Sequence, residues 1–140
     1  MYILINIITI ALAFLIHYEL LYRMSLTIPK LPVPQRLKIL FALFGALIAH
    51  VIEIWMFALV YYYMITHSGF GELVGNFTGT LLDCGYYSVT SYTSLGFGDI
   101  VPHGHIRFLT GFEALTGLML ITWTASFLFI EMQRFWSTKG

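Results

Sequence analysis

The sequence predicts an all-α membrane protein with three transmembrane helices, and two observations lead to this fold class. Hydrophobic residues make up 59% of the 140 residues and charged residues only 10%, whereas soluble domains average roughly 45–50% and 25%. Apolar segments at about 2–22, 39–66 and 106–129 are each long enough to cross a bilayer, which takes about 20 helical residues. We therefore expect a chain embedded in a lipid bilayer.

Charge and cysteine content exclude several function classes. The formal net charge is zero and no basic block occurs, so we expect no nucleic-acid partner. Cys84 is the only cysteine, which excludes an intrachain disulfide. The sequence contains no nucleophile–base pair, phosphate-binding loop or metal-ligand spacing, so we expect neither an enzyme nor a cofactor. Residues 1–16 lack a basic n-region, so we expect the N-terminus to be retained.

The first segment is predicted to form a transmembrane helix within residues 1–24, followed by a linker at 25–38. Prolines that interrupt a helix and cations without a neighbouring acid mark this linker: Pro29, Pro32, Pro34, Arg23, Lys30, Arg36 and Lys38. By the positive-inside rule the linker is cytoplasmic, so the N-terminus lies outside. Arg134 and Lys139 agree with a cytoplasmic C-terminus. We expect this orientation in the cell (plasma) membrane and no cytoplasmic sensor domain.

The second and third segments flank the most informative region. We expect an outer helix, an irregular Gly-rich stretch, a short helix and an inner helix, at 39–66, 68–79, 80–93 and 106–134. The short helix is too brief to span a bilayer. Thr80 and Asp83 form a Thr-x-x-Asp pattern at its start, in which the hydroxyl caps backbone N–H groups and the carboxylate lies at the positive helix end.

Residues 86–99 read Tyr-Tyr-Ser-Val-Thr-Ser-Tyr-Thr-Ser-Leu-Gly-Phe-Gly-Asp, and this stretch resembles the pore helix and selectivity filter of potassium channels. The family pattern is a threonine, then valine or isoleucine, then Gly-Tyr/Phe-Gly-Asp. The resemblance extends over the flanking helices, so residues 39–136 are predicted to form a two-helix pore module of the prokaryotic type. It implies a re-entrant pore helix with a filter at 94–99, and potassium as the permeant ion.

A filter of this kind surrounds a dehydrated cation with backbone carbonyls that point at one axis. Glycine reaches positive φ without steric penalty, so Gly96 and Gly98 can alternate with Leu95 and Phe97 to aim successive carbonyls inward. Ser94 adds a hydroxyl to the innermost site. Potassium ions are therefore expected at Ser94, Leu95, Gly96 and Phe97.

Three residues are expected to support the filter from outside it: Asp99, Tyr87 and Thr93. The resemblance implies that the hydroxyl of Tyr87 holds Asp99. A possible hinge lies at Gly117 of the inner helix, and the alternative is that this glycine permits close helix packing. If the inner-helix alignment holds, the cavity below the filter is lined by Leu118, Ile121 and Ala125.

The filter departs from the family pattern, and the departures leave alternatives open. Ser94 replaces the usual threonine, Leu95 replaces valine or isoleucine, and Phe97 replaces the commonest tyrosine. A leucine that packs behind the filter can loosen selectivity. The leading prediction is passive potassium conduction by a homotetramer, because one chain supplies a single filter strand. The alternatives are a weakly selective monovalent cation channel, or a non-conducting membrane subunit that uses the pore fold for assembly.

Ionisable residues inside predicted spans are candidates for function because burial in a bilayer is costly; they are His17, Glu19, His50, Glu53 and Glu113. A rise of about 1.5 Å per residue places Glu53 near the midplane and Glu113 in the outer half. The two acids are therefore expected to approach one another behind the filter. Two hypotheses remain for His50, Glu53 and Glu113: a proton-sensing gate, or a buried polar cluster between helices.

Overall fold

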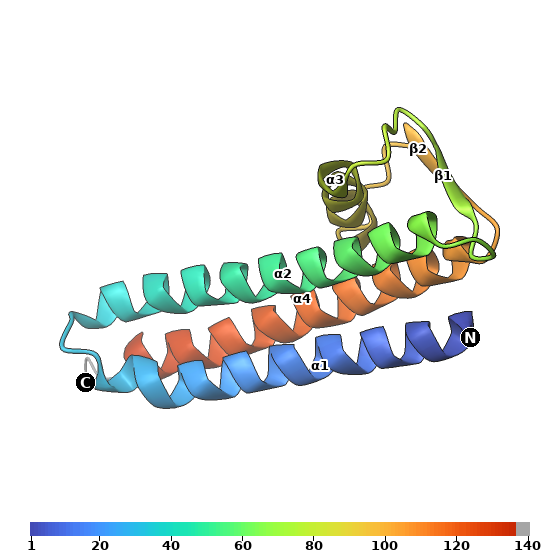
Figure 1. The fold of residues 1–140 in the computed structure, drawn as a ribbon. Helices are drawn as coiled ribbons and strands as arrows, with labels where there is room; N and C mark the ends of the chain where they lie inside the picture. The colour runs from blue at the N-terminus through green and yellow to red at the C-terminus, as the bar shows by residue number, and fades with distance from the viewer. Residues whose placement is uncertain (137–140) are drawn as a thin grey trace.

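The computed structural model describes residues 1–136, so Lys139 lies outside the described part of the chain. Three long helices lie side by side, and a short helix and a small sheet sit at one end of this bundle (Figure 1). The helices are α1 (Tyr2–Thr27), α2 (Gln35–Thr66), α3 (Leu81–Tyr92) and α4 (Ile106–Trp136), with a 3-10 turn at Ile28–Lys30. The strands are β1 (Glu72–Gly75) and β2 (Ile100–His103).

The long helices α1, α2 and α4 are long and apolar enough to cross a membrane, which confirms the prediction of three spans. The 32 residues of α2 extend about 48 Å, which exceeds the roughly 30 Å of a hydrocarbon core. Helix α2 begins at Gln35, four residues before the predicted start, because Pro34 caps it without needing a backbone N–H. Helix α1 continues to Thr27, beyond the predicted end at 24.

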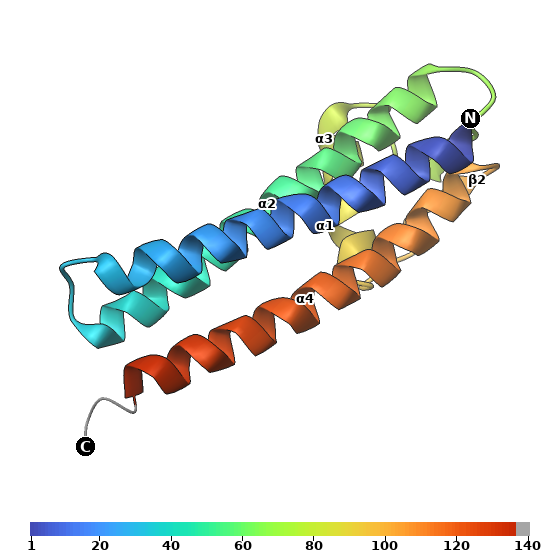
Figure 2. The ribbon, with the colours of Figure 1, turned by 90° about the horizontal axis from the view of Figure 1, so that it is seen from below.

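The course of the chain separates two groups of features at opposite ends of the bundle. Helices α1 and α4 run in one direction and α2 in the other (Figures 1 and 2). The N-terminus, α3 and the sheet lie at one end, and the α1–α2 connection and the last turn of α4 lie at the other. The linker cations and Arg134 therefore share the end remote from residues 94–99.

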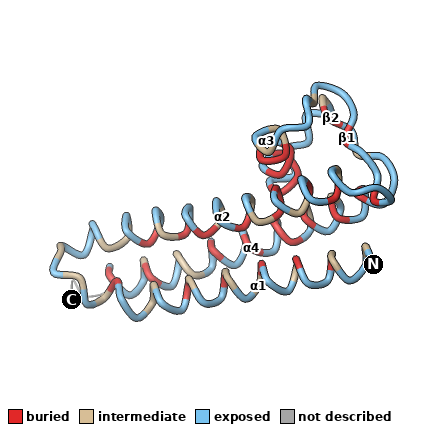
Figure 3. The backbone as a smooth tube through the Cα atoms, viewed as in Figure 1, coloured by how far each residue is buried: buried red, intermediate tan, exposed pale blue. Residues whose placement is uncertain are grey.

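Small and polar side chains are buried in the interior of the bundle beside large apolar ones such as Phe57 and Tyr61. Helix α1 buries every third or fourth residue on one face, namely Asn6, Thr9, Ala13, His17 and Leu21. Helix α2 buries Ala42, Ala46 and Ala49, and small residues of this kind let membrane helices approach closely. Large apolar side chains such as Phe44 and Phe129 are exposed, and much of the backbone of the three long helices is coloured as exposed (Figure 3). That exposure suits a lipid environment.

The all-α prediction missed a two-stranded sheet in the described residues. Strand β1 pairs antiparallel with β2, with Glu72 opposite His103 and Gly75 opposite Ile100. The expectation of an irregular stretch at 68–79 was therefore wrong for the residues of β1. Each strand has only four residues, too few for a period-2 pattern to stand out, and Pro102 is tolerated because both strands are edge strands.

Candidate functional site

The short helix α3 begins with the capping arrangement that its sequence predicts. Thr80 Oγ1 accepts a hydrogen bond of 3.1 Å from Asp83 N, and Asp83 Oδ2 accepts one of 3.4 Å from Thr80 N. Thr78 donates to the same carboxylate from its backbone N at 2.8 Å and from its hydroxyl at 2.5 Å. These Thr78 hydrogen bonds, the hydroxyl one foremost, hold the pKa of Asp83 below its ordinary value. The predicted capping box is confirmed.

Helix α3 is wedged against α2 and α4. Ser88 Oγ donates to the backbone carbonyl of Ile54 at 2.8 Å. A Cβ at Gly85 would come within 3.2 Å of the Trp55 ring, and one at Gly117 within 2.0 Å of the Tyr92 carbonyl oxygen. Gly117 therefore lets the last turn of α3 rest directly on α4, which runs unbroken through this position. Close packing of α3 on α4 therefore explains why residue 117 is a glycine. The hypothesis that Gly117 acts as a hinge stays a prediction.

Residues 94–99 leave α3 in an alternating backbone conformation. Positive φ angles occur at every second residue, with 57° at Ser94, 49° at Gly96 and 78° at Gly98. The expected positive φ at the two glycines is confirmed. Ser94 is the one non-glycine residue with positive φ in the described chain, and residues other than glycine adopt this region only at a cost. This alternation is the backbone pattern that the expected aim of successive carbonyls toward one axis requires.

Backbone hydrogen bonds anchor this segment at both of its ends. At the α3 end, Ser94 N donates to the Ser91 carbonyl at 2.9 Å and Gly96 N donates to the Thr90 carbonyl at 3.1 Å. At the other end, the Asp99 carbonyl accepts a bond of 2.8 Å from Asn76 N, next to the β1–β2 pairing. The segment is therefore held between the end of α3 and the start of β2.

The middle of the segment is not covered by its own chain. Leu95 is 57% exposed and Phe97 is 65% exposed, although both are large apolar side chains. A cavity of about 450 Å³ opens beside the segment, and its lining includes Thr90, Thr110 and Ala114. Thr93 is also exposed, and its hydroxyl donates to the Val89 carbonyl at 2.7 Å, which closes the end of α3. An isolated chain therefore leaves this segment incompletely packed.

The predicted contact between Tyr87 and Asp99 is wrong. The Tyr86 hydroxyl donates to Asp99 Oδ2 at 2.9 Å, and this bond is the main cause that raises the pKa of Tyr86. Tyr87 is one helical step further round, is buried, and shares a 2.9 Å hydrogen bond with the Thr110 hydroxyl of α4. The sequence could not distinguish the two neighbouring tyrosines, because the rotation of α3 about its axis depends on its packing partners.

The buried acids Glu53 and Glu113 bond to different partners, and no contact between the two carboxylates is found in the described residues, so their expected approach stays a prediction. Glu113 Oε1 accepts from the Ser88 hydroxyl at 2.5 Å, and its Oε2 accepts from the Tyr61 hydroxyl at 2.5 Å. Glu53 instead accepts from Tyr92 and faces His17 and His50. The hypothesis of a buried polar cluster thus fits both acids, and the hypothesis of a proton-sensing gate stays a prediction.

His17 was predicted as a candidate from its place in the first span, but periodicity did not indicate its partner. His17 is fully buried, and its Nδ1 lies 2.8 Å from Glu53 Oε1 of α2. It therefore joins α1 to the helices that hold the 94–99 segment. Glu19, the other candidate on α1, pairs with Arg23 at 2.5 Å on an exposed face.

Comparisons with known proteins give one match. A protein-family model described as an ion channel matches residues 49–134, which is more than half of the chain. The matched region covers most of α2, all of α3 with the segment that follows it, and nearly all of α4. Neither a curated protein nor a solved structure matches the chain.

Proposed function

Because the chain belongs to the ion channel family of two-helix pore-loop proteins, we propose that it is the pore-forming subunit of a potassium-selective channel. The observation that carries the proposal is the alternation of positive φ at Ser94, Gly96 and Gly98. Stacked backbone carbonyls of this kind replace the hydration shell of a potassium ion. Ser94, Leu95, Gly96 and Phe97 supply the ion-binding oxygens in this proposal, and the segment with α3 forms a re-entrant pore loop.

A homotetramer follows from the same segment. One strand cannot surround an ion, and the exposed Leu95 and Phe97 need apolar cover from neighbouring chains. Four copies around one axis meet both requirements with closed cyclic symmetry. The C-terminal end of each α3 then points toward the axis, where its partial negative charge favours a cation.

The orientation in the membrane is proposed from charge. The cations of the linker and Arg134 lie at the end of the bundle remote from the filter, and cationic connections stay in the cytoplasm. The filter and the N-terminus then face the outside of the plasma membrane. A cysteine introduced near residue 2, in a chain whose Cys84 is replaced by serine, should react with an impermeant external reagent. Labelling only from the cytoplasmic side would refute this orientation.

Potassium flux from liposomes that contain the purified protein tests the proposed function. Gly96→Ala should abolish selective flux, because a left-handed alanine costs about 1–2 kcal/mol per chain. The matched control is Gly69→Ala, which also has positive φ and open space around it, but lies outside the filter. Wild-type flux in the Gly96→Ala protein would contradict the filter assignment.

Ser94 and Leu95 favour one alternative function, a channel that selects weakly among monovalent cations. Reversal potentials measured in mixed sodium and potassium solutions distinguish a potassium-selective channel from a weakly selective one. A reversal potential that changes with the potassium gradient and not with the sodium gradient supports the proposal. A wild-type protein that assembles but passes no ion would instead indicate a subunit that uses the fold only for assembly.

A further inference from the structure

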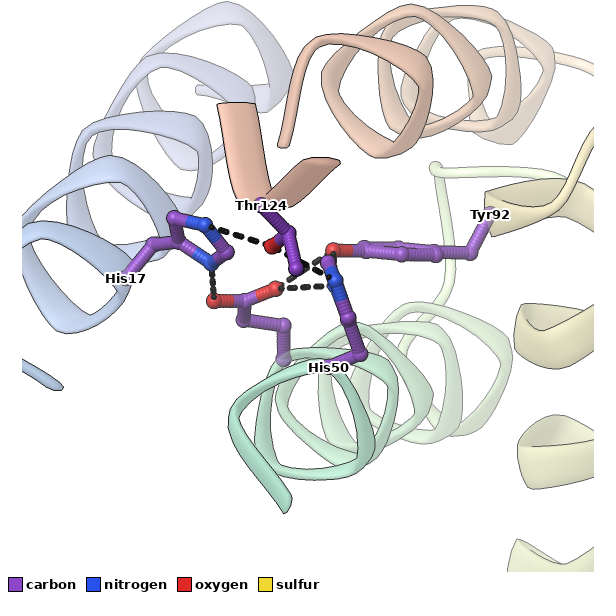
Figure 4. Close-up of polar contacts among 5 residues, drawn as sticks. His17, His50, Tyr92 and Thr124 are labelled. Atoms are coloured by element: carbon purple, nitrogen blue, oxygen red, sulfur yellow. Dashed lines mark hydrogen bonds and ion pairs between the residues drawn. The ribbon is translucent and has the colours of Figure 1, made fainter. Parts of the chain in front are cut away.

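Five polar side chains meet in the interior of the bundle, one or two from each helix. Figure 4 shows His17 of α1, His50 of α2, Tyr92 of α3 and Thr124 of α4 pointing toward one another. His17 and Glu53 are fully buried, and the His50 side chain is 15% exposed. This cluster lies outside the filter, and the proposed conduction mechanism does not use it.

The distances define which atoms face each other. His17 Nδ1 lies 2.8 Å from Glu53 Oε1. His50 Nδ1 lies 2.9 Å from Tyr92 Oη and 3.4 Å from Glu53 Oε2, and the Tyr92 hydroxyl donates to that same Oε2. On the far side of both rings, Thr124 Oγ1 lies 3.2 Å from His17 Nε2 and 3.0 Å from His50 Nε2.

The available hydrogens do not satisfy this arrangement when both imidazoles are neutral. An ionised Glu53 only accepts, so His17 must carry its hydrogen on Nδ1. The single hydroxyl hydrogen of Tyr92 goes to Glu53, so His50 also donates from Nδ1. Both Nε2 atoms are then acceptors that face Thr124, whose one hydrogen serves only one of them. The cluster is therefore short of one donor hydrogen, because a buried acceptor without a donor is unfavourable, and either a proton on one imidazole or a bound cation would remove this deficit.

We propose that His17, His50 and Glu53 bind a divalent transition-metal ion of the zinc class. Two imidazoles and a carboxylate are ligands that zinc takes readily. One ligating atom from each residue lies within 4.8 Å of the other two. Two nitrogen or oxygen ligands of a tetrahedral zinc ion lie about 3.3 Å apart, so a pair at the 4.8 Å limit must close by about 1.5 Å through side-chain rotation.

A bound metal ion would remove the shortage of donors at the two Nε2 atoms. With the ion on both Nδ1 atoms, each histidine carries its hydrogen on Nε2 and donates it to Thr124 Oγ1, which has two lone pairs. Metal-bound histidines usually donate their other N–H in this way. The Tyr92 hydroxyl keeps its bond to Glu53 and orients the carboxylate. The site departs from the sequence-based expectation of no cofactor, and it ties α1 to α2 beside the residue that ends α3.

Metal titration of the purified, detergent-solubilised protein tests the site. After treatment with EDTA, Co²⁺ should bind once per chain and give absorption bands of a nitrogen- and oxygen-ligated ion, and Zn²⁺ should displace it. The key variant is His17→Asn, because the asparagine NH2 group can still donate to Glu53 from the place of Nδ1, whereas an amide nitrogen does not coordinate a metal ion and the amide oxygen is a poor substitute for an imidazole nitrogen on zinc. Its affinity should fall at least tenfold, and that of Thr124→Val by about 10–100-fold.

The matched control is His67→Asn, which alters an exposed histidine at the end of α2 and should leave the affinity unchanged. Zn²⁺ should also raise the Tm of the wild type and the control, but not that of His17→Asn. If His17→Asn does not fold, the same metal titration of His50→Asn and Thr124→Val tests the site, and both variants should bind the metal ion more weakly than the wild type. Equal metal affinity in wild type and the cluster variants, or a loss of binding in the control, would overturn the proposal. The potassium proposal is unaffected by either result, since the filter assay needs no added metal.

Discussion

Replacing Gly117 with alanine should force the last turn of α3 away from α4. The new Cβ would lie 2.0 Å from the Tyr92 carbonyl oxygen and 3.0 Å from Tyr92 Cγ. Carbon–oxygen contacts settle near 3.3 Å, so the two helices must separate locally by about 1.3 Å. No side-chain rotation relieves this clash, because the oxygen belongs to the backbone of α3. Overpacking of this kind costs about 1–3 kcal/mol in each chain.

The displacement should also reach the filter, since the carbonyls of Thr90 and Ser91 hold Gly96 N and Ser94 N. We expect Gly117→Ala to lower the Tm of the purified protein and to reduce potassium flux from liposomes. Gly111→Ala is the matched control, because it lies on the same helix and its Cβ would meet no atom within 4 Å. If the two variants unfold and conduct alike, the packing account of Gly117 is refuted.

Three further predictions concern the surroundings of the filter. The pKa of Asp83 is lowered in the folded chain. Its carboxylate therefore stabilises the fold fully above the ordinary pKa of about 4, and this stabilisation is lost as the pH falls through the lowered pKa of the folded state. Asp83→Asn should remove this acid-sensitive part of the stability. Tm measured against pH should show this loss in the wild type only. Tyr86→Phe should shorten the time for which potassium flux is sustained, because Asp99 loses its hydrogen bond, whereas Tyr87→Phe should leave that time unchanged. The reverse result would contradict the contact between Tyr86 and Asp99. Glu113→Leu should lower the Tm, because the buried Tyr61 hydroxyl would lose the carboxylate that accepts from it at 2.5 Å and keep only a 3.4 Å contact with the Thr110 hydroxyl, at about 1–3 kcal/mol; an unchanged Tm would argue against that network.

Features encoded by neighbouring residues could be predicted from the sequence. Thr80 and Asp83 are three positions apart, so their capping box depends only on local helix geometry. Gly96 and Gly98 carry their preference for positive φ in the residue type itself. The three spans likewise follow from long apolar runs. Ser94 shares the positive φ of the glycines without any signal in its residue type, so this strained position was missed.

Features that depend on how helices rotate against one another could not be predicted. His17 and Glu53 are 36 positions apart on different helices, and periodicity does not say which faces will meet. The predicted Tyr87–Asp99 contact failed for the same reason, since Tyr86 is the tyrosine that reaches Asp99. The short β1–β2 pairing was missed because each strand is stabilised by its partner and not by its own sequence.

The two anchors of the filter segment differ in strength. The anchor at α3 consists of two backbone hydrogen bonds to the buried residues Thr90 and Ser91. The anchor at β2 depends on one backbone bond from Asn76 and on the exposed side chain of Tyr86. Loss of order should therefore begin as fraying at Asp99 and travel toward Ser94. When the segment becomes ordered again, Ser94 should regain its backbone conformation first and Asp99 last, because the α3 end remains anchored throughout.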